Sequence, residues 1–128
     1  MAGNHDVRVE REPGAWRGLL PRNVTYFEVS GAEFQGVRFW GTPWTLTFYD
    51  WAFMEDEAQL RLRFARMPKD TPVRITHGPT WSFLDLTARG ERAGSYAQLE
   101  RLSLLGDHLR LHAHGYIHEA HGQLRVGR

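Results

Sequence analysis

The sequence contains no cysteine. Disulfide bonds and thiolate metal ligands are therefore excluded, so a bound metal would need nitrogen and oxygen donors from histidine, carboxylate and amide side chains. The chain also lacks the run of about eighteen apolar residues that spans a bilayer, and its start has no basic segment followed by an apolar one. We therefore expect a soluble, cytoplasmic protein that makes no contact with membranes.

A strong charge of either sign is likewise missing. The 128 residues include 16 basic and 15 acidic side chains, for a formal net charge of +1. These charges are spread along the chain, with no like-charge run that would form an arm for nucleic acid. The length and the 41% hydrophobic content fit one globular domain, which we expect to cover residues 1–128.

Segments whose apolar residues have the spacing of a strand alternate along the chain with segments that have the spacing of a helix. Pro68 ends one helical pattern, and Ser95 and Gly106 suit the two ends of another. The first part of the chain is expected to form a loop with at most one helical turn at 8–22, then a hairpin of strands 24–30 and 34–40 turning at Gly31, and a strand break at 41–44. A helix at 55–67, a strand at 73–76 and a loop at 81–92 are expected to follow. The last expected elements are a helix at 95–106, a strand at 109–113 and a strand at 123–126.

Two groups of polar residues are candidates for chemistry. One is Gly3-Asn-His-Asp6 near the start, and the other is a set of four histidines near the end, at positions 112, 114, 118 and 121. Histidine is a common metal ligand, which supports a general metal-binding hypothesis. On these residues alone, the alternative of ordinary surface and core histidines carries equal weight.

Three short motifs, in this order, resemble the last three motifs of the calcineurin-like metallophosphoesterases. They are Gly3-Asn-His-Asp6, His77-Gly-Pro79 after an apolar strand, and Gly115-Tyr-Ile-His118-Glu119 after another strand. The likeness extends from residue 3 to about residue 122. Shorter stretches are similar to the branch that includes cyclic-nucleotide phosphodiesterase-like members, namely Gly41-Thr-Pro-Trp44, Trp51-Ala-Phe53, Leu84-Asp85 and Gly94-Ser95.

The resemblance implies a layered α/β/β/α fold, with two β-sheets face to face and helices outside. This chain would represent the C-terminal half of that fold. The resemblance also implies a site for divalent metal ions of the manganese, iron, zinc or magnesium class, which activate a bridging hydroxide for attack on phosphorus. The substrate would be a phosphodiester or a small phosphomonoester.

The family assigns roles to the matching residues. Asn4 and His77 would bind the second metal ion through an amide oxygen and an imidazole nitrogen, and His118 would bind the first. His5 would protonate the leaving oxygen as general acid, and Asp6 would hold the His5 ring by accepting a hydrogen bond. The plainer alternatives are a turn residue for Asn4, a packed turn histidine for His77 and a turn or helix cap for Asp6.

The sequence departs from the family pattern in two ways. Tyr116 stands where the family has the first histidine of its Gly-His-x-His motif, and a phenol with a pKa near 10 is a poor ligand. Tyr116 itself and His114 are the possible substitute ligands, although for His114 a strand histidine facing solvent is the simpler interpretation. The family's upstream Asp-x-His and Gly-Asp motifs have no counterpart before Gly3. The residues expected to be structural or to support ligands are His112, His121 and Glu119.

Three hypotheses about function stay open. The first is a metal-dependent phosphoesterase that is weak or inactive as an isolated chain, because part of its ligand set is missing. The second is a non-catalytic binding or partner module with a degenerate metal site. The third is a piece of a longer protein. In each case we expect exposed strand edges and an apolar face, and hence a homo-oligomer or a partner chain that supplies the N-terminal half.

Overall fold

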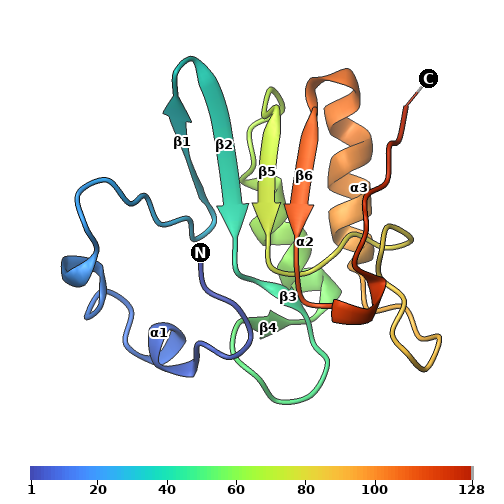
Figure 1. Ribbon diagram of the computed structural model, residues 1–128, viewed down its shortest axis with the longest axis horizontal. Coiled ribbons are helices and arrows are strands. Elements are labelled where there is room, and N and C mark those ends of the chain that lie inside the picture. Colours follow the sequence, from blue (N-terminus) through green and yellow to red (C-terminus); the bar gives the residue numbers. More distant parts are fainter. Residues whose placement is uncertain (128) are drawn as a thin grey trace.

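The computed structural model of the protein describes residues 1–127 and centres on a four-stranded sheet in the order β1-β2-β5-β6 (Figure 1). Strands β2, β5 and β6 run parallel to one another, and β1 pairs antiparallel with β2 at the edge of the sheet. The bounds are Ser30–Phe34 for β1, Val37–Thr42 for β2, Val73–Thr76 for β5 and Leu111–His114 for β6.

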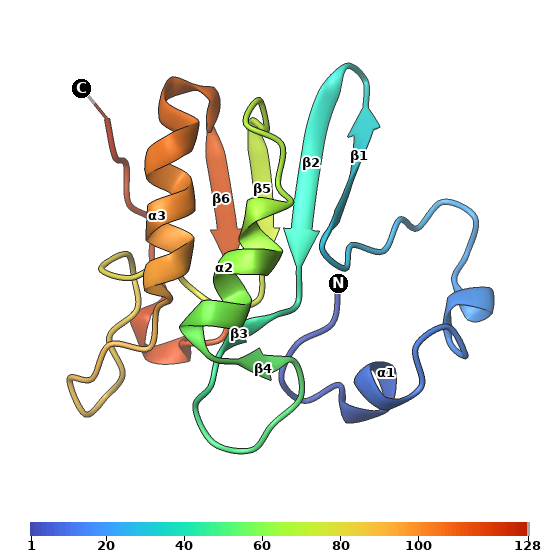
Figure 2. The same ribbon diagram turned by 180° about the vertical axis from the view of Figure 1, so that it is seen from behind.

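Two helices, α2 (Glu57–Ala65) and α3 (Tyr96–Leu105), cover one face of this sheet (Figure 2). The Asp56 carboxylate caps the first helix and the Ser95 hydroxyl caps the second, each accepting from a backbone N–H in the first turn. Apolar side chains from both helices meet the sheet. The buried core consists of Val29, Trp40, Leu60, Phe64, Met67, Ala97 and Leu105.

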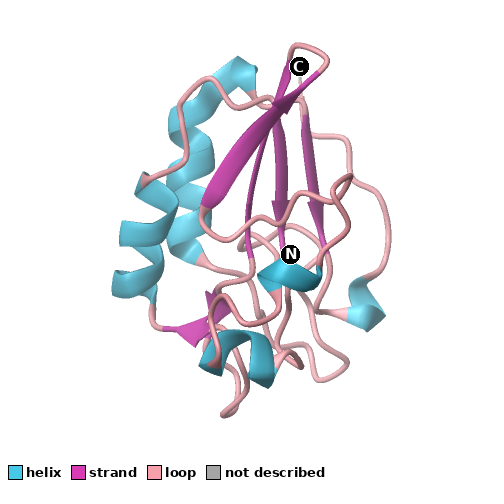
Figure 3. Ribbon diagram, turned by 90° about the vertical axis from the view of Figure 1, so that its left-hand side faces the viewer, coloured by secondary structure: helices cyan, strands magenta, loops and turns pink. Residues whose placement is uncertain are grey.

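Neither α2 nor α3 covers the opposite face of the sheet (Figure 3). Side chains alternate along a strand, so residues paired across neighbouring strands share a face. Trp40 and Arg74 pair with each other on the helix side. The pairing places the following residues on the other side, which we call the open face: Ala32, Phe34, Val37, Phe39, Val73, Ile75, Leu111 and Ala113.

Most of the other elements lie at the end of the sheet toward which β2, β5 and β6 point (Figure 1). A small parallel sheet of β3 and β4 lies there beside the first residues of the chain. None of the described helices is long and apolar enough to cross a bilayer. The bounds are Thr45–Leu46 for β3, Met54–Glu55 for β4, Val7–Arg11 for α1, and Arg17–Leu19, Gly106–His108 and His118–Ala120 for the 3-10 turns η1, η2 and η3.

The predicted helices and two of the predicted strands are confirmed, with shifted ends. They correspond to α2, α3, β5 and β6. The predicted last strand at 123–126 is wrong. Those residues are exposed, and within the described chain they pair with no neighbouring strand that would satisfy their backbone groups.

The predicted hairpin exists, but its turn lies elsewhere. Gln35 and Gly36 form the turn, with φ of 50° and 77°, as a tight two-residue hairpin connection requires. Gly31 lies within β1, where a Cβ would come within 2.4 Å of the Phe39 carbonyl oxygen. This glycine therefore permits close strand pairing rather than a turn. The predicted strand at 24–30 is wrong, because the first strand begins only at Ser30.

The α/β class is confirmed. The observed architecture is one main sheet with helices on a single face, together with the small sheet of β3 and β4.

Candidate functional site

The sequence motifs meet beyond the carboxyl ends of the parallel strands, the usual position for sites in such sheets. His77 directly follows β5, and His118 follows β6 after a short loop. Asn4 comes from the first loop of the chain. Its Oδ1 lies 2.7 Å from His77 Nε2, although the two residues are 73 positions apart. The fold therefore brings the first and second motifs into direct contact.

This contact requires a glycine at position 3. A Cβ on Gly3 would lie 2.6 Å from His77 Cε1, so a larger residue would displace the imidazole ring. Asn4 is only 5% exposed, and its carbonyl accepts a hydrogen bond from the Ala52 N–H at 3.0 Å. The backbone on both sides of the Asn4 side chain is therefore held in place.

Asp6 closes the turn that presents Asn4. Its Oδ2 accepts from the Gly3 N–H at 2.7 Å, and its own N–H donates to the Gly3 carbonyl at 3.0 Å. No hydrogen bond joins Asp6 to His5 within residues 1–127. The His5 ring packs instead against Trp51, with ring centres 5.6 Å apart. Asp6 thus occupies the turn-cap role in this structure.

A cavity of about 340 Å³ lies between the first and third motifs. Its walls come from the first loop, an aromatic loop, the loop before α3 and the segment after β6. Asn4, His5 and His118 share this space. The lining residues are Asn4, His5, Phe48, Tyr49, Trp51, Thr87, Ala88, Arg89, Glu91, Tyr116, Ile117, His118 and Glu119.

The imidazole of His77 is held in its neutral form. Burial is the main cause that lowers the pKa of His77; the charge of Asp6 acts in the opposite direction, while His5 and His118 lower it further. Because an amide oxygen only accepts hydrogen bonds, His77 Nε2 donates to Asn4. A neutral imidazole is the form that binds metal ions, once that nitrogen is free.

Tyr116 closes the cavity beside His77, with ring centres 5.3 Å apart. Its φ is 77°, an uncommon value for a residue other than glycine. The hydroxyl is buried without a hydrogen-bond partner among the described residues, and burial raises the pKa of Tyr116 to about 12. The phenol therefore stays neutral near pH 7, and a neutral phenol is a poorer metal ligand than an imidazole.

His114, the candidate substitute ligand, does not line this cavity. It pairs with Thr76 on the helix side of the sheet, and its ring lies 5.1 Å from that of His112. His112 is hydrogen-bonded through Nε2 to the Thr76 hydroxyl at 2.7 Å. The structure therefore places both histidines in the packing between sheet and helices.

The loop before α3 supplies cavity residues that the sequence did not reveal, among them Arg89. The Ala88 N–H donates to Glu119 Oε1 at 2.7 Å, which fastens the loop to the third motif. Asp85 is buried and pairs with Arg92 at 2.6 Å, which closes the base of the loop. A run of charged residues around Gly90, between the second motif and the helix at Ser95, was the signal available in the sequence.

The described residues do not form a complete metal site. No group of three or more histidine, cysteine or acidic side chains within residues 1–127 is placed to hold a metal ion. Asn4 and His77, the two motif side chains in contact, would both be uncharged metal ligands. Divalent ions in proteins take at least four ligands, usually including carboxylates or several imidazoles. The described residues near the cavity do not offer such a set.

Comparisons with known proteins agree with the motifs. No protein-family model matches the sequence. The chain is 31% identical to metallophosphoesterase domain-containing protein 1 of Homo sapiens over 109 residues, which cover 84% of the chain and 33% of that protein. The Mus musculus protein gives the same values. A UPF0046 protein of Caenorhabditis elegans is 30% identical over 141 aligned positions, which cover 99% of the chain and 47% of that protein.

The chain thus spans between a third and a half of the length of these relatives. The similarity to the human and mouse proteins extends over most of the chain, and the shared name of those proteins specifies the metallophosphoesterase domain. Together with the order of the three motifs, these matches show that the chain belongs to the metallophosphoesterase family.

Proposed function

We propose that the chain forms one half of the active site of a metal-dependent phosphoesterase that hydrolyses phosphodiesters or phosphomonoesters. One observation carries the proposal. Asn4 and His77 contact each other across 73 positions of sequence, at the edge of a cavity that also holds His5 and His118. These are the residues to which the family resemblance assigns metal binding and proton transfer.

Several residues of the chain suit separate tasks in such a site. His5 is exposed on the cavity wall, where its imidazole can donate a proton to the leaving oxygen. Arg89 lines the same cavity. Its positively charged, planar guanidinium can pair with the negatively charged oxygens of a phosphoryl group. A divalent metal ion, when bound, would supply positive charge at the phosphoryl oxygens.

The metal ligands that these residues do not provide must come from elsewhere. We propose that they are carboxylates of another chain or of a further part of the protein, packed as a second sheet against the open face. That arrangement would produce the four-layer α/β/β/α fold. By itself the chain should bind metal ions weakly and hydrolyse phosphodiesters slowly.

Hydrolysis of bis(p-nitrophenyl) phosphate with added manganese tests the proposal. We expect slow, metal-dependent hydrolysis that falls at least about tenfold in His5→Ala and in His77→Ala. His108→Ala is the matched control, because this exposed histidine lies in η2 outside the cavity. Equal metal-dependent rates in all four proteins, or no dependence on manganese, would refute an enzymatic role.

The second candidate function is a non-catalytic module that binds a partner through its open face. Two observations favour it. Burial keeps the Tyr116 phenol neutral, and a neutral phenol is a poor metal ligand. Phe34 and Leu111 on the open face are 66% and 56% exposed. The occupant that we propose is a second copy of the chain, because an apolar, uncharged sheet face is complementary to itself. Association without any metal-dependent hydrolysis would support this function over the first.

A further inference from the structure

A buried arginine lies on the helix side of the main sheet, away from the cavity of the candidate site. Arg74 occupies the middle of β5 and is fully buried. All three guanidinium nitrogens lack a hydrogen-bond partner among residues 1–127. The guanidinium carbon lies 4.9 Å from the centre of the Phe64 ring, a favourable contact that leaves the N–H donors unsatisfied. A buried charge without partners is strongly destabilising.

A second arginine approaches from α3. Nη2 of Arg101 donates to the Met67 carbonyl just beyond the end of α2, while its Nε is buried and has no partner within the described chain. Burial, and then the charge of Arg101, lower the pKa of Arg74 to about 9. Arg74 therefore remains a cation near neutral pH, and the two positive charges repel each other.

Two carbonyl groups in the turn after α2 already accept hydrogen bonds. The Met67 carbonyl accepts from Arg101, and the Pro68 carbonyl accepts from the Thr71 hydroxyl at 2.8 Å. The carboxylates on α3 and at the start of α2 serve other groups, since Glu100 pairs with Arg61 and Glu57 accepts from the first turn of α3. The described chain thus offers these donors no anion of its own.

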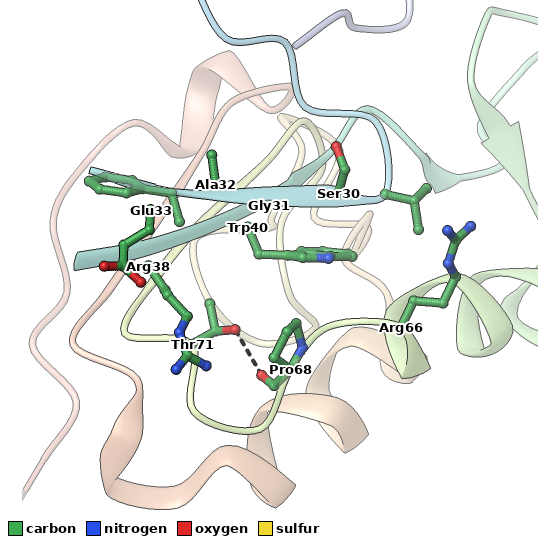
Figure 4. Close-up of a pocket in the computed structure, with 11 residues that line it drawn as sticks. Ser30, Gly31, Ala32, Glu33, Arg38, Trp40, Arg66, Pro68 and Thr71 are labelled. Carbon is green, nitrogen blue, oxygen red and sulfur yellow. Dashed lines mark hydrogen bonds between the residues drawn. The ribbon is translucent and has the colours of Figure 1, made fainter. Parts of the chain in front are cut away.

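A cavity of about 360 Å³ lies beside Trp40, between β1 and the turn after α2 (Figure 4). Pro68 and Thr71, from the turn after α2, form one wall, and Trp40 lies between them and β1. Trp40 is the cross-strand neighbour of Arg74. Arg38 and Arg66 lie on opposite sides of Trp40. Glu33 also lines the cavity, and Arg38 pairs with Asp70.

We propose that Arg74 and Arg101 bind a small inorganic anion of chloride size between β5 and the C-terminal end of α2. An anion there satisfies buried N–H donors and neutralises two charges that otherwise repel. Full burial of Arg74 restricts the ligand to a compact ion. The site contributes to stability and is independent of the phosphoesterase function proposed above.

Thermal unfolding of the whole chain in different salts tests this site. Chloride is raised from about 1 mM to about 300 mM while gluconate, a bulky anion, keeps the ionic strength constant. Because an anion that binds only the folded state raises the melting temperature, we expect a rise of about 5 °C. A melting temperature that does not change with chloride would overturn the proposal.

Arg74→Met separates specific binding from a general salt effect. The substitution replaces the charged side chain with an apolar one that suits a protein core. The variant should therefore fold, and its melting temperature should not depend on chloride. Arg61→Met is the matched control, because this arginine is half exposed and pairs with Glu100 on the surface; it should keep the full dependence. Equal chloride dependence in Arg74→Met and in the unchanged protein would overturn the proposal.

A direct measurement does not depend on the stability of the variant. Crystals grown in bromide should show an anomalous-scattering peak within hydrogen-bond distance of both the Arg74 and the Arg101 guanidinium groups. A bromide structure without a peak between these side chains would also refute the site.

Discussion

At the residue scale, the contact between Asn4 and His77 depends on Gly3, which has no side chain. The Cβ that any other residue would place at position 3 would meet the His77 ring at 2.6 Å. The same glycine anchors the Asp6 turn through its N–H. Gly3 therefore supports both the position of the amide and the position of the imidazole.

We expect Gly3→Ala to lower the free energy of unfolding by about 1–3 kcal/mol, because the methyl group must displace a packed ring. Metal-dependent hydrolysis should decrease at the same time. Urea denaturation and the phosphodiesterase assay measure the two effects. Gly18→Ala is the control, because a Cβ at Gly18 meets nothing within 4 Å; an equal loss of stability in both variants would contradict the explanation.

His112 should make the stability of the chain depend on pH. Burial, and then the nearby charges of Arg74 and His114, hold the pKa of His112 well below its ordinary value of 6.5. Protonation therefore favours the unfolded chain, so this contribution to stability is complete above pH 6.5 and is lost as the pH falls. We expect the free energy of unfolding to decrease by up to about 1.4 kcal/mol per pH unit below that value.

Urea denaturation between pH 7.5 and pH 5 measures this slope. His112→Gln keeps a side chain that can bond to the Thr76 hydroxyl, and it should flatten the slope. His108→Gln changes an exposed histidine and should leave the slope as it is. If both variants have the same pH dependence as the unchanged protein, another group is responsible.

At the scale of elements, one carboxylate joins the two helices. Glu57 in the first turn of α2 accepts hydrogen bonds from the Tyr96 N–H at 2.6 Å and the Ala97 N–H at 3.0 Å. The Ser95 hydroxyl also donates to it, at 2.8 Å. These groups belong to the start of α3, where unpaired N–H donors and the helix dipole favour a negative charge. Glu57 therefore couples the two helices that cover the sheet.

We expect Glu57→Ala to destabilise the protein by about 1–2 kcal/mol, since it leaves N–H donors at the start of α3 without partners. Chemical denaturation followed by circular dichroism measures the change. Glu100→Ala is the comparison, because it removes a carboxylate whose ion pair is exposed and should have little effect. Similar losses in the two variants would mean that general helix charge, and not the cap, is important.

At the scale of the whole molecule, the helices protect only one face of the sheet. The open face includes Phe34, Val37 and Leu111, all of which are exposed. Exposed apolar patches of this kind on a sheet usually mark contact surfaces. What packs against this face distinguishes the two hypotheses, which are half of a layered enzyme and a partner module.

We expect the isolated chain to form a dimer that Phe34→Glu weakens at least about tenfold, because the charge would be buried in the contact. Sedimentation at several concentrations measures the dissociation constant. Leu62→Glu is closely matched, since Leu62 and Phe34 are both 66% exposed but Leu62 lies on α2. A chain that is monomeric at all concentrations, or equal weakening by both changes, would count against dimer formation through the open face.

The elements that the sequence by itself determined are those fixed by local chemistry. Ser95 and Gly106 delimit α3, Pro68 follows α2, and the β-branched run at 73–76 is β5, because caps, proline and side-chain branching act on the neighbouring backbone. The family motifs also identified Asn4, His77 and His118 as candidate site residues before their positions were known.

Only the tertiary structure decided which residues meet. The hairpin turns at Gly36 and not at Gly31, because pairing with β2 places Gly31 against the Phe39 carbonyl. Arg89 lines the cavity from the loop before α3, where the Ala88 N–H donates to Glu119. His114 lies outside the cavity, because its pairing with Thr76 places it on the helix side of the sheet. These outcomes depend on contacts between segments that are distant in sequence, and local conformational preferences do not predict such contacts.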